Sequence, residues 1–200
     1  MRSLTAVPLR VAALGGVLGP AAFIGAWAVG GATTATEYSA VHDAISRLAA
    51  VGADTRPLMT GGFITFAVAV PVYATALRRT VSGVSWITAI ITGAATLAIA
   101  AAPLDRSPTI DSWHAAFAGI GYVTLAATPL LAARPLRRSG HLALARFGVA
   151  AGSMSAVALA LTTTGLPTGL LQRVGLTATD AWIVASAVAI VTGRLAPRPD

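Results

Sequence analysis

The side chains in this sequence that could bind a ligand or act on one are few, and long uncharged stretches separate them. They include two histidines, His42 and His114, and several aspartates. Imidazole and carboxylate groups can exchange protons, neutralise a cation or bind a metal ion. If the fold brings these residues together, they form one polar site whose candidate members are His42, Ser46, Asp105, His114, Arg173 and Asp180.

Two classes of function are open for this polar set. In the first, the protein binds or moves a lipid or small solute, with the polar set as its recognition site at the outer face of the membrane. In the second, it is a membrane-embedded lipid hydrolase that uses a His/Asp site, with or without Ser. A catalytic zinc needs three protein ligands, which would come from His42, His114, Asp105 and Asp180.

The spacing of the histidines favours the first class. Neither a His-x-x-x-His nor a His-Glu-x-x-His pattern occurs in the chain, and there is no cysteine. The sequence therefore assigns neither an enzymatic activity nor a cofactor. The expected partners are membrane lipids, together with a lipid or small-molecule ligand.

The elements that must position these residues are membrane-spanning helices. Of the 200 residues, 56% are hydrophobic and 10% are charged, which is too apolar for an ordinary soluble domain. Helices satisfy their own backbone in lipid, and the alternation typical of a membrane barrel is absent. The sequence predicts an all-α polytopic bundle, a single transmembrane domain over residues 1–200, with about six spans near 11–31, 57–77, 84–102, 112–133, 142–164 and 176–194.

Charge predicts how these spans are oriented, because arginine gathers in cytoplasmic connections. Four arginines fall on one side: Arg47, Arg56, Arg106 and Arg173. Ten fall on the side of both termini: Arg2, Arg10, Arg78, Arg79, Arg134, Arg137, Arg138, Arg146, Arg194 and Arg198. We therefore expect a multi-pass protein of the cell (cytoplasmic) membrane with both termini cytoplasmic.

The acidic residues are distributed in the opposite way. Six of the seven, Asp180 among them, are predicted outside, and Asp200 is the exception. All 14 basic residues are arginine, which is typical of a bacterial genome of high GC content and predicts a bacterial inner membrane protein. The arginines are dispersed at span ends rather than clustered as in a nucleic-acid binder, so nucleic acid is excluded as a partner.

The first outer connection, residues 32–56, is the longest and is predicted to hold an interfacial amphipathic helix. Thr34 and Glu37 have the spacing of a capping box, and apolar residues recur at helical spacing from Tyr38 to Leu48. Such a helix would lie in the plane of the membrane surface. It would place His42 at the edge of its apolar stripe, able to point toward the bundle.

The acids Asp54 and Asp111 precede spans two and four, where a carboxylate can cap the exposed amides of a helix start. Trp113 and Trp182 fit an aromatic belt at one membrane surface. Two glycine pairs, Gly15-x-x-x-Gly19 and Gly148-x-x-x-Gly152, predict close helix packing within the chain.

Asp180 is harder to explain as a cap. Only 13 residues separate it from Arg194, which is about 20 Å of helix and short for a bilayer core. Either span six begins upstream, near Val174, with Asp180 inside the helix, or Arg194 reaches the surface from below it. An ionisable residue inside a membrane indicates a functional site.

Two stretches of the chain resemble a known family. The run from Tyr38 to Leu48 (YSAVHDAISRL) and the run from Arg56 to Phe63 (RPLMTGGF) are similar to the prokaryotic integral-membrane family called domain of unknown function 998 (DUF998). Pro103-Leu104-Asp105, the segment around His114 and the run from Gly169 to Arg173 are similar to it as well. The resemblance implies a six-helix membrane protein and assigns no activity.

Overall fold

The computed structural model describes residues 7–198, and its regular structure over this range is entirely helical. The elements are α1 (Leu9–Thr33), η1 (Ile45–Ala49), α2 (Arg56–Thr80), α3 (Ser85–Ala101), α4 (Pro108–Arg138), α5 (Leu142–Leu161) and α6 (Thr168–Val191). The predicted all-α bundle is confirmed.

Five of the helices are long and apolar enough to cross a membrane, and α3 is shorter, with 17 residues. At 1.5 Å per residue α3 measures about 25 Å, and it connects the end where α2 stops to the opposite end where α4 begins. The chain is thus a multi-pass membrane protein.

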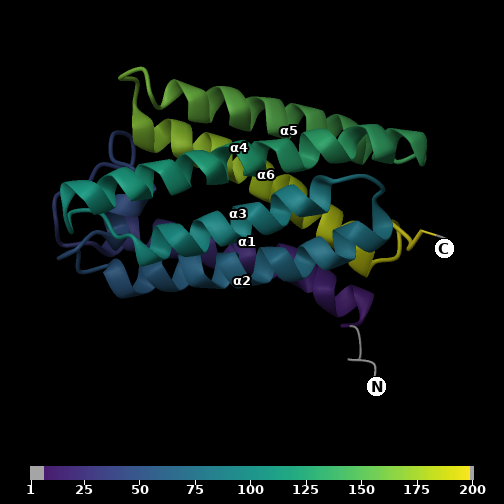
Figure 1. The fold of residues 1–200 in the computed structure, drawn as a ribbon, viewed down its shortest axis with the longest axis horizontal. Helices are drawn as coiled ribbons and strands as arrows, with labels where there is room; N and C mark the ends of the chain where they lie inside the picture. Colours follow the sequence, from purple (N-terminus) through teal and green to yellow (C-terminus); the bar gives the residue numbers. More distant parts are fainter. Residues whose placement is uncertain (1–6, 199–200) are drawn as a thin grey trace.

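The six α-helices run lengthwise beside one another (Figure 1), and their contacts close them into a ring. Each helix packs against the next one in the chain, and α6 completes the ring by packing against α1. Arg79 donates a hydrogen bond to the carbonyl of Val7 (3.1 Å), and Arg198 donates one to the carbonyl of Arg78 (2.8 Å). Residues 7 and 198 therefore lie at the same end of the bundle, here called the termini end. The opposite end, which carries residues 34–55, is called the loop end.

The predicted orientation rests partly on residues beyond this range, since Arg2 and Asp200 lie outside the described residues.

Glycines bring neighbouring helices into direct contact, as their spacing predicted. A Cβ atom built on Gly15 of α1 would fall on the carbonyl oxygen of Ala69 in α2. One built on Gly152 of α5 would lie 2.8 Å from the carbonyl oxygen of Ala126 in α4. Only glycine allows backbones to approach this closely, so both glycine pairs serve packing within one chain.

The first connection differs from the predicted amphipathic helix. Its regular structure is the five-residue 3-10 helix η1, and residues 34–44 form bends and turns. Ile45 and Leu48 are both buried, because a helix of three residues per turn puts positions three apart on one face. The prediction of a longer amphipathic helix was therefore wrong.

Thr34 does not act as a helix cap but bonds to the far end of the same loop. Its hydroxyl donates to Asp54 Oδ1 (2.8 Å), and the backbone N–H of Ala35 donates to Asp54 Oδ2 (2.9 Å). These hydrogen bonds lower the pKa of Asp54 below its usual value, and the one from the backbone of Ala35 has the largest effect. Asp54 closes the loop rather than capping α2.

The start of α6 decides between the two positions that the sequence left open for Asp180, in favour of the upstream start with Asp180 inside the helix. The helix begins at Thr168, eight residues before the predicted start at 176. Asp180 is therefore 12 residues into the helix (180 − 168), about 18 Å along it, and is not in an outer connection. The earlier helix start also places Trp182 inside the bundle. Its side chain is fully buried, and its indole N–H donates to the carbonyl of Leu144 (3.1 Å), so Trp182 is not part of an exposed aromatic belt.

The contact between α1 and α2 can be tested with matched alanine substitutions. Gly15→Ala should lower the free energy of unfolding by about 1–3 kcal/mol, because the added methyl group overpacks against a backbone carbonyl. Gly25→Ala in the same helix meets no atom within 4 Å and should leave stability unchanged or slightly higher. Denaturant titration in detergent measures both, and equal stability of the two variants would contradict the close contact.

Candidate functional site

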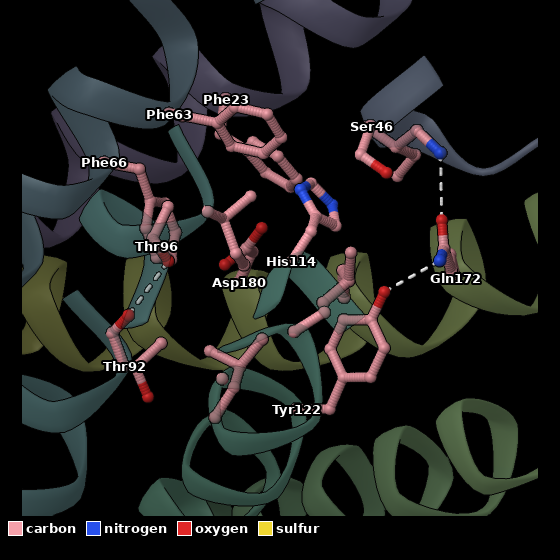
Figure 2. Close-up of a pocket in the computed structure, with 16 residues that line it drawn as sticks. Phe23, Ser46, Phe63, Phe66, Thr92, Thr96, His114, Tyr122, Gln172 and Asp180 are labelled. Atoms are coloured by element: carbon pink, nitrogen blue, oxygen red, sulfur yellow. Dashed lines mark hydrogen bonds between the residues drawn. The ribbon is translucent and has the colours of Figure 1, made fainter. Parts of the chain in front are cut away.

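A cavity lies inside the helix ring, nearer its loop end (Figure 2). The space open to the centres of water molecules is about 60 Å³, and one water needs about 10–15 Å³ on this measure. Its polar lining side chains are Ser46, Thr92, Thr96, His114, Tyr122, Gln172 and Asp180. We call this space the central cavity.

Asp180 is the unusual member of this lining. Its side chain is 1% exposed, and both carboxyl oxygens lack a hydrogen-bond partner among the described residues. Among residues 7–198, Asp180 carries the only buried carboxyl group. An isolated ionised carboxylate in a protein interior costs several kcal/mol, so this group requires a proton or a cation.

Spacing along α6 explains why Asp180 faces the cavity. Gln172, Leu176 and Asp180 all line it, and positions four and eight apart lie on one face of a helix. The same face therefore carries an amide near the loop end and a carboxyl two turns deeper.

His114 lines the cavity from α4 and is 6% exposed. Its Nδ1 lies 2.7 Å from the carbonyl oxygen of Ala102, at the end of α3. A carbonyl can only accept, so Nδ1 carries the proton, and in the neutral ring Nε2 is left as an acceptor. Figure 2 shows the ring between the carboxyl of Asp180 and Ser46.

A chain of hydrogen bonds closes the loop end of the cavity. The backbone N–H of Ile45, at the start of η1, donates to Gln172 Oε1 (2.9 Å), and Gln172 Nε2 donates to the hydroxyl of Tyr122 (2.7 Å). One amide thus joins η1, α4 and α6. Sequence reasoning did not select Gln172 or Tyr122; the signal that could have found them is a polar side chain within an apolar helix.

A groove with a volume of about 630 Å³ runs along the outside of the bundle next to the cavity. Its wall consists mainly of small and aliphatic residues from α4 and α5, including the exposed Gly119, Val123 and Leu130. We call it the lateral groove. It shares five lining residues with the central cavity: Ser46, His114, Ala118, Tyr122 and Gln172.

The lateral groove exists because α4 and α5 diverge. They are in close contact at Gly148 and Gly152, where a Cβ would lie within about 3 Å of α4 atoms. From there they separate toward the loop end (Figure 1). Alanines of α5, Ala156 and Ala160, leave the space between them unfilled.

The structure brings three of the six predicted site residues, Ser46, His114 and Asp180, to the central cavity. His42 is exposed and does not line it, because the turn before η1 replaces the helix that would have aimed it inward. Asp105 is also exposed and pairs with Arg47, whose Nη1 is 2.8 Å from each carboxyl oxygen.

Arg173, the sixth candidate, binds the outer loop rather than the cavity. Its Nη1 donates to the carbonyls of Ala40 (2.7 Å) and Gly169 (2.9 Å), and its Nη2 donates to the hydroxyl of Tyr38. The guanidinium also lies over the ring of Trp27, 5.2 Å from its centroid. Burial raises the pKa of Tyr38 despite this neighbouring charge.

Within residues 7–198, no group of three or more histidine, cysteine, aspartate or glutamate side chains is placed to hold a metal ion. The alternative set of His42, His114, Asp105 and Asp180 is not assembled, since two of its members are on the surface of the loop end.

Comparison with known proteins identifies a family for most of the chain. A family model described as Protein of unknown function (DUF998) matches residues 17–189, which confirms the resemblance seen in the sequence. No curated protein and no solved structure matches the chain.

The role of Arg173 in holding the loop can be tested by hydrogen exchange. Arg173→Lys keeps the charge but loses the forked donor geometry, so residues 38–45 should exchange their amide hydrogens at least about tenfold faster, given about 1.5–3 kcal/mol per bond to a charged group. Arg47→Lys is the control, because an exposed ion pair contributes about 0–1 kcal/mol. Equal protection in both variants would show that Arg173 does not hold the loop.

Proposed function

The chain belongs to the DUF998 family, and we propose that this member binds an amphiphile, a membrane lipid or lipid-like molecule with one apolar chain and a hydrogen-bonding polar end. The observation that carries the proposal is the shared wall of the lateral groove and the central cavity. An apolar, membrane-facing surface there continues directly into an interior cavity that carries several polar side chains.

The lateral groove suits an acyl or isoprenoid chain. Small side chains, Ala115, Ala118 and Gly119, line α4 beside the opening, and Val123 and Leu130 extend the apolar surface toward mid-membrane. The groove volume of about 630 Å³ lies within the range of about 300–1,000 Å³ for ligand sites.

The polar end of the ligand belongs at the shared wall. There His114 offers an acceptor, Tyr122 and Gln172 offer hydrogen-bonding groups beyond the bonds they already make, and Ser46 offers a hydroxyl. Few polar groups on an otherwise apolar surface are typical of sites that orient a ligand.

We place the loop end at the outer face of a bacterial cytoplasmic membrane, with the termini end in the cytoplasm. The excess of arginine near the termini end, including Arg78, Arg79, Arg137 and Arg138, supports this orientation. The amphiphile then enters from the outer leaflet.

Binding is favoured over the alternative of lipid hydrolysis. Activation of a serine nucleophile requires a base within hydrogen-bond reach, and among the described residues the ring of His114 bonds to the carbonyl of Ala102 and not to Ser46. The proposal is therefore recognition or movement of the amphiphile without its cleavage.

A bulky residue in the lateral groove tests the proposal. Gly119→Trp directs an indole from α4 toward the groove, starting from open space, because a Cβ at Gly119 meets no atom within 4 Å. Labelling of α4 and α5 by a lipid with a photoreactive acyl chain, in membranes, should fall about tenfold, equivalent to about 1.4 kcal/mol of lost binding.

The matched control is Gly61→Trp on the exposed face of α2, where a Cβ also meets no atom within 4 Å. It should leave the labelling of α4 and α5 unchanged. Labelling that is spread evenly over all helices, or that survives Gly119→Trp, would reject the lateral groove as a binding site.

A further inference from the structure

We propose that the central cavity binds an alkylammonium group, with the carboxylate of Asp180 as its counter-ion. The starting point is the missing partner of Asp180: a fully buried carboxyl that lines a cavity and accepts no hydrogen bond among the described residues. A cation held in the cavity supplies the compensating charge that the protein itself does not.

Aromatic rings form the second part of the site. Phe23 of α1 packs against Phe63 and Phe66 of α2, with ring centroids 5.8 and 5.5 Å apart, and all three line the cavity. Figure 2 shows them grouped on one side of the Asp180 carboxyl. An ammonium group is attracted both to a carboxylate and to the faces of aromatic rings.

The lining distinguishes an organic cation from a metal ion. Mg²⁺ and Ca²⁺ take six or more oxygen ligands, whereas the hydroxyl of Thr92 already bonds to Thr124 and to the carbonyl of Thr88. Apart from Thr96, His114 and the polar groups of Ser46, Tyr122 and Gln172, the rest of the lining is aromatic or aliphatic. Such a wall suits the methyl and methylene groups beside an ammonium nitrogen.

No other charged side chain competes for Asp180 in the described lining. The lining residues of α1, α2, α3 and η1 carry no titratable group, α4 contributes His114 and Tyr122, and α6 contributes Asp180 itself. The cation therefore competes with a proton on Asp180, and a proton on His114 opposes the cation as well. Both effects make binding stronger as pH rises.

The ammonium group has two sources, a free small amine or the head of an amphiphile whose chain lies in the lateral groove. Because the cavity and the groove share His114 and Tyr122, the head of such an amphiphile reaches the cavity from the groove. The cation site itself does not require the groove to hold a lipid.

The test uses the purified full-length chain in detergent and measures its thermal stability in the presence of dimethylammonium. Dimethylammonium stays charged at pH 6–8, as a lysine ammonium with a pKa of about 10.4 does. A ligand at concentration c that binds the folded state stabilises it by RT ln(1 + c/Kd), so the melting temperature rises with the logarithm of the ligand concentration once that concentration exceeds Kd. The apparent Kd obtained from this dependence should fall from about pH 6 to about pH 8.

Asp180→Asn should weaken the apparent affinity at least about tenfold, since the amide has the same shape and no charge. Thr179→Val is the control. It removes a neighbouring buried hydroxyl that also lacks a hydrogen-bond partner but lies outside the cavity lining, so this variant should bind dimethylammonium as the unaltered chain does.

Phe66→Leu keeps the wall apolar but removes one aromatic ring, and it should weaken binding about threefold or more. This test does not depend on whether Asp180→Asn folds.

Dodecylammonium distinguishes the two sources. If the group belongs to an amphiphile, dodecylammonium binds more tightly than dimethylammonium, and Gly119→Trp removes that advantage while leaving dimethylammonium binding intact. If it is a free amine, Gly119→Trp has no effect on either. The proposal is overturned if neither amine stabilises the chain, or if Asp180→Asn and Phe66→Leu bind them as well as the unaltered chain, in which case Asp180 holds only a proton.

Discussion

The hydrocarbon core of a bilayer offers a peptide group no hydrogen-bond partner, and every part of this bundle is governed by that requirement. Helices satisfy the backbone, and several buried hydroxyls pair across helices for the same reason. Thr88 pairs with Thr128 and Thr92 with Thr124, both at 2.8 Å, which joins α3 to α4. In the same way the hydroxyl of Tyr73 pairs with that of Ser186 (2.6 Å) across α2 and α6. The hydroxyls of Ser85, Ser155 and Thr179 are buried without a partner as well, but among the described residues Asp180 is the one buried carboxyl left unpaired.

Close packing at one position creates open space at another. Glycines hold α4 and α5 together near the termini end, and straight helices that touch at one point must separate away from it. Larger side chains at Ala156 and Ala160 of α5 would have filled the resulting gap. Alanine fills it poorly, so the lateral groove follows from the composition of α5 as much as from its crossing with α4.

The number and order of the helices could be predicted from the sequence, because uncharged stretches of about 20 residues report directly on the thickness of the bilayer. The start of α6 could not be predicted in this way. Gln172 and Arg173 indicate an exposed connection, yet both lie inside α6, since their polar groups bond to the loop that folds over them. Tertiary contacts thus compensated for residues that looked unfavourable in a span.

The span predicted to start at 176 also grouped Asp180, which the sequence did select, with the wrong neighbours. With α6 starting at 176, Asp180 is near a membrane surface, and its neighbours in the candidate set are other surface acids such as Asp105. With α6 starting at Thr168, Asp180 is deep in the ring, where burial and not surface charge governs it. The aromatic cluster of Phe23, Phe63 and Phe66 could not be associated with it from sequence, because the three rings come from helices more than a hundred residues away in the chain.

The same helix connects the loop to the interior. Gln172 holds the start of η1, Arg173 holds the preceding turn, and Asp180 lies two turns deeper on the face that Gln172 shares. An α-helix transmits displacement along its axis because its backbone hydrogen bonds keep it rigid. A shift of α6 that moves the Asp180 carboxyl therefore also moves the amide that closes the loop end. Neutralising that carboxyl, by a proton or by the proposed cation, removes a cost of several kcal/mol from the folded ring, and the helix that carries it also holds the two side chains that fix the outer loop.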